Sequence, residues 1–161
     1  ALGHRRIGFL GGREDLESSR RRERGFRHAM EAAGVPVDPD LVGVGGYRKD
    51  SALGPATDLL SRPEPPTAVF AANDLSALGV LAVAARLGLR VPDDVSVIGF
   101  DDVPEAASAT PPLTTVRQPI QEMGAAGIDL LVALMSGQKT PDTHVRLPTT
   151  LLVRGTTSPP R

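Results

Sequence analysis

The feature that most constrains the fold is a regular alternation of short apolar runs with segments of helical periodicity. The apolar run at 95–100 has the pattern of a strand buried on both faces of a sheet. Further strands are predicted at 7–10, 41–44, 67–72 and 114–116, and helices at 17–33, 55–61, 74–87 and 119–136. This order predicts an α/β fold of the Rossmann-like, three-layer kind. Its open sheet would be mostly parallel, with right-handed crossovers and helices on both faces.

Residues that start and stop helices refine these boundaries. Asn73 or Asp74 is expected to cap the third helix, and Gly88 to end it. Pro55 is expected in the first turn of the second helix, because a later proline would interrupt the hydrogen-bond ladder. Pro148 confines the β-rich segment 145–153 to a bend or an edge strand. The tail at 157–161, together with Thr156 before it, is expected to be disordered.

Composition excludes several classes of protein. The 161 residues suffice for one α/β domain, and a net charge of −1 gives no basic field that would attract nucleic acid. The chain has no Cys and its three His are far apart, so we expect no disulfide and no metal site. No apolar stretch is long enough to span a membrane, and no signal peptide opens the chain. We therefore expect a cytoplasmic protein. Because the chain begins at the edge of a predicted strand, we also expect it to be a piece of a longer protein.

Polar or glycine pairs follow three of the predicted strands. Gly11-Gly12, Asn73-Asp74 and Asp101-Asp102 each stand where a strand ends. Ligands of open α/β sheets bind outside the carboxyl ends of the strands, so these pairs together predict a site at one rim. The alternative for Asn73 or Asp101 alone is a helix cap or a turn.

Other candidate groups have simple structural explanations. The arginine-rich run at 20–24 lies on a predicted helix among glutamates, which favours a solvated face. Tyr47 either stacks on a ligand or fills a gap in its glycine-rich loop. The sequence contains neither a G-x-G-x-x-G fingerprint nor a P-loop, so no nucleotide cofactor is expected. Because no set of residues matches a catalytic motif, we expect no enzyme.

Four long motifs, in this order, resemble the effector-binding core of the LacI/GalR family of transcriptional repressors. They are Gly3 to Gly12, Pro66 to Gly79, Leu87 to Asp102, and Pro111 to Pro119. The resemblance extends from Gly3 to Thr156. It implies the C-terminal lobe of a periplasmic-binding-protein-like core at 1–156, without the DNA-binding headpiece and without most of the N-terminal lobe.

The resemblance also implies a function. Such a core binds a small molecule, here a sugar, between its lobes and controls operator DNA through the absent headpiece, usually as a homodimer. The motif positions that match effector-binding residues are Arg22, Tyr47, Asn73, Asp101 and Gln118. The alternatives are a sugar-binding protein of an ABC uptake system and, third, a small-molecule enzyme on the same scaffold.

Two features depart from or extend the family pattern. Arg48-Lys49-Asp50 and Gly54-Pro55 are unusual after Tyr47, which affects the placement of that residue. The helix in 119–137 resembles one that packs on the missing lobe. We expect it either to fold back or to pack against a second copy, since its apolar face has lost its partner.

Overall fold

The computed structural model describes residues 2–138 and 144–161 of the chain. Six strands form one sheet in the order β2-β1-β3-β4-β5-β6, with parallel pairing throughout except for the antiparallel pair β5–β6. The strands are β1 (Ile7–Gly11), β2 (Val42–Val44), β3 (Ala68–Ala71), β4 (Ser96–Asp101), β5 (Thr114–Arg117) and β6 (Thr150–Leu152). The predicted mostly parallel α/β sheet is therefore confirmed.

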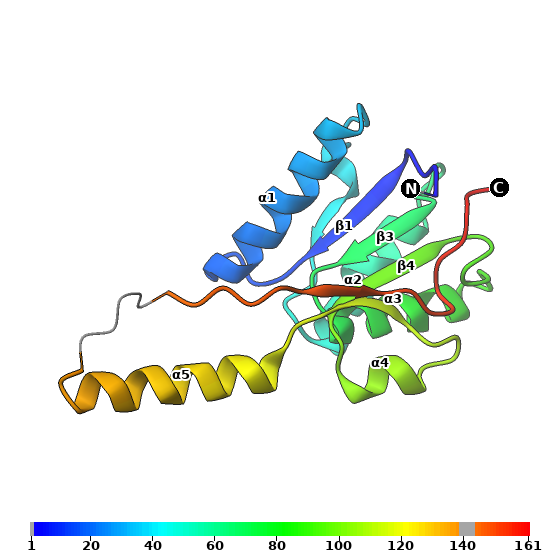
Figure 1. Ribbon diagram of the computed structural model, residues 1–161. Helices are drawn as coiled ribbons and strands as arrows, with labels where there is room; N and C mark the ends of the chain where they lie inside the picture. The colour runs from blue at the N-terminus through cyan, green and yellow to red at the C-terminus, as the bar shows by residue number, and fades with distance from the viewer. Residues whose placement is uncertain (1, 139–143) are drawn as a thin grey trace.

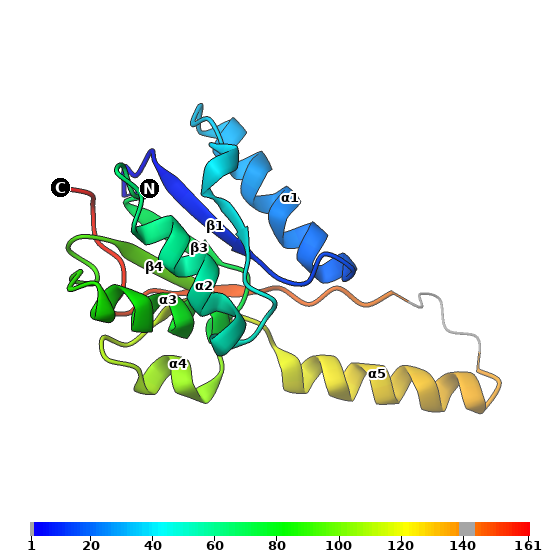
Figure 2. The same ribbon diagram turned by 180° about the vertical axis from the view of Figure 1, so that it is seen from behind.

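Helices cover both faces of this sheet (Figures 1 and 2). Helix α1 (Glu17–Ala32) lies on one face, and α2 (Lys49–Leu60) and α3 (Asp74–Arg86) lie on the other; α4 (Pro104–Ser108) and a 3₁₀ turn (Pro39–Leu41) complete the body. The alternation of side chains along β1 shows the division. Phe9 packs with Phe26 under α1, whereas Leu10 belongs to the larger core beneath α2 and α3.

The second helix begins earlier than predicted. It starts at Lys49, so Pro55 lies inside the helix and not in its first turn. Proline removes one ladder hydrogen bond there. The helix buries Ala52, Ala56 and Leu59 against the core, and this burial offsets the loss. Helix α4, with only five residues, was not predicted at all.

The C-terminal segment is ordered, and the expectation of a disordered tail is wrong. Thr156 is buried, where its hydroxyl donates to Val97 O at 2.7 Å and accepts from Thr114 N at 2.8 Å. Two residues later, Ser158 N donates to the Ser96 hydroxyl at 3.1 Å. The segment therefore occupies the space beside β4 and closes the body of the protein.

Helix α5 (Ile120–Met135) projects away from the rest of the molecule (Figure 1). None of its residues is buried, and seven large apolar side chains are about half exposed or more: Ile120, Met123, Ile128, Leu131, Val132, Leu134 and Met135. The expected fold-back is therefore absent, while packing against a second copy stays a prediction.

No helix among residues 2–138 and 144–161 has the length and apolar character needed to cross a membrane.

Candidate functional site

The carboxyl ends of β1, β3, β4 and β5 meet at one edge of the sheet, called here the carboxyl rim, and Arg22 reaches this rim from α1. Its Nη2 lies 3.2 Å from Asp101 Oδ1, and its Nη1 donates a hydrogen bond to Ala72 O. The guanidinium also stacks on the Phe100 ring, 4.1 Å from the ring centre. The side chains of Arg22 and Asp101 are only 16% and 20% exposed, so this is a half-buried pair, unlike the other arginines of α1.

Asp101 is held from a second side by Gln118, whose Nε2 donates to the same Oδ1 at 2.7 Å. Both contacts use Oδ1, and Oδ2 receives no hydrogen bond from the residues described. Burial raises the pKa of Asp101, against the opposing attraction of Arg22 and the Gln118 hydrogen bond. Asp101 also adopts φ 120°, a conformation that L residues rarely take. A carboxylate that is partly desolvated, strained and short of donors is suited to accept hydrogen bonds from a ligand.

Tyr47 lies beside this pair, with its ring 5.5 Å from the Arg22 guanidinium. The ring packs flat over Gly12, where a Cβ would come within 2.1 Å of Tyr47 Cζ. The structure therefore supports the interpretation that Tyr47 fills a gap. Stacking of this ring on a ligand stays a prediction.

Asn73 has a structural role that accounts for both ends of its amide. Its Oδ1 accepts from Ser76 N at 2.9 Å, which confirms Asn73 as the N-cap of α3, and its Nδ2 donates to Tyr47 O at 3.1 Å. The second contact holds the Tyr47 backbone at φ 65°. Asn73 thus positions the Tyr47 loop, and its contact with a ligand is a further prediction.

All five predicted residues lie in one connected group, although they come from five separate segments of the chain. Sequence reasoning missed Phe100, the platform for Arg22, and also Arg154, which binds the neighbouring Asp102. Phe100 could have been found, because it stands directly before the Asp101-Asp102 pair. Nothing local to Arg154 marks it as a partner of a residue 52 positions earlier.

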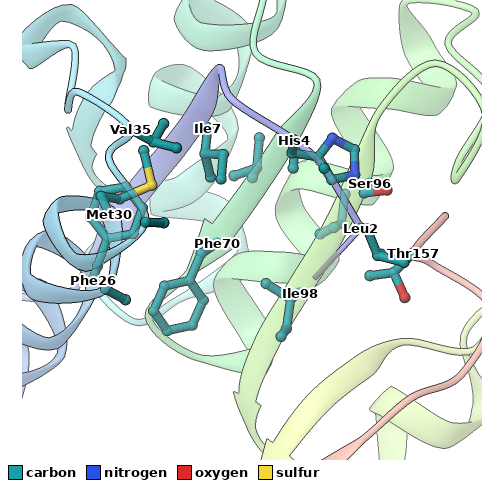
Figure 3. A pocket seen from close by; sticks show the side chains of 16 residues that line it. Leu2, His4, Ile7, Phe26, Met30, Val35, Phe70, Ser96, Ile98 and Thr157 are labelled. Carbon is teal, nitrogen blue, oxygen red and sulfur yellow. The ribbon is translucent and has the colours of Figure 1, made fainter. Parts of the chain in front are cut away.

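A hollow with a mostly apolar lining lies away from this rim (Figure 3). It measures about 370 Å³ and lies between α1 and the sheet, toward the amino ends of the strands, where Phe26, Met30, Phe70 and Ile98 line it. The polar nitrogens of His4 at its edge already contact Thr67 and Ser158. This groove offers no free polar groups comparable to those of the carboxyl rim, so the rim is the better candidate for a polar ligand.

A hollow of about 350 Å³ adjoins the rim between Asp101, Gln118 and the first turn of α5. The residues described contain no group of His, Cys, Asp and Glu side chains arranged to hold a metal ion. The arrangement can therefore bind a small polar molecule through one carboxylate, one guanidinium and one amide.

Comparison with known proteins gives a consistent result. Residues 1–157 match the family described as "Periplasmic binding protein-like domain". Over 155 residues the chain is 38% identical to the HTH-type transcriptional repressor CytR of Escherichia coli K12. This match covers 96% of this chain and 46% of that protein. It is 41% identical over 152 residues to the HTH-type transcriptional regulator CelR of Thermobifida fusca, covering 94% and 45%. The chain thus spans about half the length of the curated relatives it matches.

Solved structures agree with this. A LacI family transcriptional regulator from Mycobacterium smegmatis superposes with a TM-score of 0.92 and 37% identity, over 99% of this chain and 60% of that one. A complex of the transcriptional regulator CelR with cellobiose superposes with a TM-score of 0.91 and 41% identity, over 96% and 47%.

Proposed function

Because this chain belongs to the periplasmic-binding-protein-like family, in the form found in LacI-type regulators, we propose that it is the effector-sensing part of a transcriptional regulator. The observation that carries the proposal is the half-buried Arg22–Asp101–Gln118 network at the carboxyl rim. Its groups are donors and acceptors for a small polar ligand, and they occupy the part of the fold where such ligands bind.

We propose a sugar as the effector. Asp101 Oδ2 can accept from a sugar hydroxyl, while the guanidinium of Arg22 and the amide of Gln118 can donate to others. The Tyr47 ring can cover the apolar face of the sugar ring. One relative of known structure is a complex with cellobiose, which supports this class of ligand.

The rim supplies only one wall of a cleft, and we propose that the N-terminal lobe supplies the other. The exposed apolar side chains of α5 support this arrangement, because none of the residues of this helix is buried. Helix 119–137 would then pack on the missing N-terminal lobe, and residues 1–156 would form the C-terminal lobe.

Regulation would proceed by a shift between two arrangements of the lobes. An effector that binds one arrangement better than the other biases the headpieces toward or away from operator DNA. A related structure is described as a lac repressor dimer bound to operator and to an anti-inducer, which supports operator DNA and a second subunit as partners. The relatives reported above are transcriptional regulators, which favours a cytoplasmic, non-enzymatic role over sugar uptake.

The test uses the full-length protein and Asp101→Ala. Thermal shift against a panel of monosaccharides and disaccharides, including cellobiose, should identify a stabilising sugar for the parent protein. Asp101→Ala should abolish that stabilisation and the sugar's effect on operator binding, measured by fluorescence anisotropy, while operator binding itself remains. Loss of operator binding without sugar would instead show that Asp101 is structural.

A matched control is Asp94→Ala, since Asp94 also binds an arginine, Arg90, but lies away from the rim.

A further expectation concerns the 161-residue chain alone. A charge-assisted hydrogen bond contributes about 1.5–3 kcal/mol, so losing several from the missing lobe weakens affinity by orders of magnitude. Calorimetry should therefore detect no tight sugar binding, and micromolar binding would contradict the half-site.

A further inference from the structure

Helix α5 joins the body through two segments only, which are called here the arm root. The chain enters α5 from Arg117, the last residue of β5, and returns through β6, after which Arg154 follows. These two segments pair with each other antiparallel, with Arg117 opposite Thr150. The arm root is therefore the part of the body that sets the position and direction from which α5 leaves it.

One side chain of the body, that of Asp102, binds both segments. Asp102 Oδ2 accepts from Arg117 Nε at 2.6 Å, and Asp102 Oδ1 accepts from Arg154 Nη2 at 2.5 Å. Arg154 Nη1 also donates to Leu113 O at 2.9 Å, which ties the returning segment to the start of β5. Asp102 is 10% exposed and Arg154 19%, so the central pair is shielded from water, whereas Arg117 is 56% exposed.

The loop that carries Asp102 is fixed on its other side as well. Val103 N donates to the buried Asp74 at 2.9 Å, and Asp74 accepts from the Thr115 hydroxyl of β5 at 2.5 Å. Asp101, the residue before Asp102, contacts Arg22 and Gln118. The two consecutive aspartates thus have different partners. Asp101 belongs to the proposed ligand site, and Asp102 binds the arm root.

We propose that Asp102 is a positioning residue that clamps both strands of the arm root to the ligand-binding loop, and so sets the orientation of α5 against the body. This proposal rests on the proposed function, because the lobe carried by α5 is the part whose orientation an effector would change. The clamp makes any shift of the 101–102 backbone pull directly on Arg117 and Arg154.

The charge state of Asp102 fits this role. Burial alone would raise the pKa of Asp102, but the hydrogen bonds from Arg154 and Arg117 outweigh it and hold the pKa below its usual range. The carboxylate is therefore ionised at neutral pH. Asp102 adopts φ 64°, which Asp and Asn tolerate better than most residues. Asp102→Asn therefore removes the charge without changing the size of the side chain or its compatibility with this backbone.

The experiment measures arm orientation in the full-length protein and needs no effector. Spin labels are placed on Asp58→Cys in α2 and Asp129→Cys in α5, and any Cys outside these 161 residues is replaced, because the 161 residues contain none. Labelled protein is diluted with unlabelled protein so that only distances within one subunit are recorded by double electron–electron resonance. The parent should give a narrow distribution, and Asp102→Asn a broader and shifted one.

Matched variants separate a clamp from a general loss of stability. Asp94→Asn removes an ionised partner of Arg90 elsewhere on the body and should leave the distribution unchanged. Arg154→Gln should broaden it as Asp102→Asn does, and the double variant should add nothing further, since both changes open the same contact. If Asp102→Asn fails to fold, the exposed Arg117→Gln should still give a smaller broadening.

The outcomes are distinguishable from failure of the proposed function. A parent-like distribution in the Asp102→Asn and Arg154→Gln variants overturns the clamp, even where a sugar binds at Asp101. Broadening in these variants supports the clamp, even where no sugar of the panel stabilises the protein. Equal broadening in Asp94→Asn would also overturn it, because the effect would then reflect stability alone.

Discussion

Helices α3 and α5 are both rich in alanine and leucine, yet they occupy opposite environments. In α3 seven of 13 residues are buried, whereas none of the 16 residues of α5 is buried. Val80 of α3 is fully covered by the core, and Val132 of α5 is 56% exposed. Apolar composition shows that a helix needs a partner, and only the rest of the chain decides whether that partner is present.

The glycines of the two helices show the same contrast. Gly79 lets α3 approach the start of α2, where an added Cβ would lie 2.8 Å from Lys49 O. Around Gly124 of α5, an added Cβ would meet nothing within 4 Å. Glycine is therefore required by packing in α3, whereas in α5 this chain gives it no packing role.

The largest expected effect comes from truncating one valine in each helix. In the 161-residue chain, Val80→Ala should lower the free energy of unfolding by about 2 to 3 kcal/mol, because it removes buried methyl groups and leaves a cavity. Val132→Ala should change it by less than about 0.5 kcal/mol. Urea unfolding followed by circular dichroism measures both.

Repeating this pair in the full-length protein sharpens the comparison. There the Val132→Ala variant should become destabilising, since the proposed N-terminal lobe covers α5. If Val132→Ala stays neutral in the longer protein, α5 does not pack on that lobe through this face.

The second pair should give effects of opposite sign. Gly79→Ala should destabilise the 161-residue chain by about 1 to 2 kcal/mol, because the clash with Lys49 O exceeds the gain in helix propensity. Gly124→Ala meets no clash and should increase the helicity of α5, by up to about 1 kcal/mol in local stability. Far-ultraviolet circular dichroism and urea unfolding distinguish the two, and a stabilising Gly79→Ala would contradict the close approach of α2 and α3.

Features set by local chemistry were predictable from the sequence. The cap at Asn73 and the stop at Gly88 follow from side-chain hydrogen bonding and from φ preference, and the structure has both. The strand order along the chain followed from the alternation of apolar and helical segments. The start of α2 was mispredicted because a rule about Pro55 in isolation ignored the burial of Ala56 and Leu59.

Contacts between distant segments were harder to predict. The pairing of Arg22 with Asp101 spans 79 positions and was not predicted, although the family resemblance placed both residues in one effector site. The order of the C-terminal segment depends on Thr156, whose hydroxyl satisfies Val97 O and Thr114 N together. A short polar terminus carries no sign of such a role until the strands it joins are in place.

The smallest effect should come from the residues that end the two helices. Gly88 after α3 has φ 73° and Gly137 after α5 has φ 69°, and neither has a neighbour that would meet a Cβ. Alanine at either position should therefore cost only the backbone strain of the left-handed region, about 1 kcal/mol.

The same backbone strain should have different consequences at the end of α3 and at the end of α5. Because α3 unfolds with the core, Gly88→Ala should lower the global stability of the 161-residue chain by that amount. Gly137→Ala should only fray the last turn of the exposed α5, which amide hydrogen exchange detects in residues 132–136 while the urea midpoint stays unchanged. A shift of the midpoint in Gly137→Ala equal to that of Gly88→Ala would show that α5 unfolds together with the body, and the contrast between the two helices would then hold for burial but not for cooperativity.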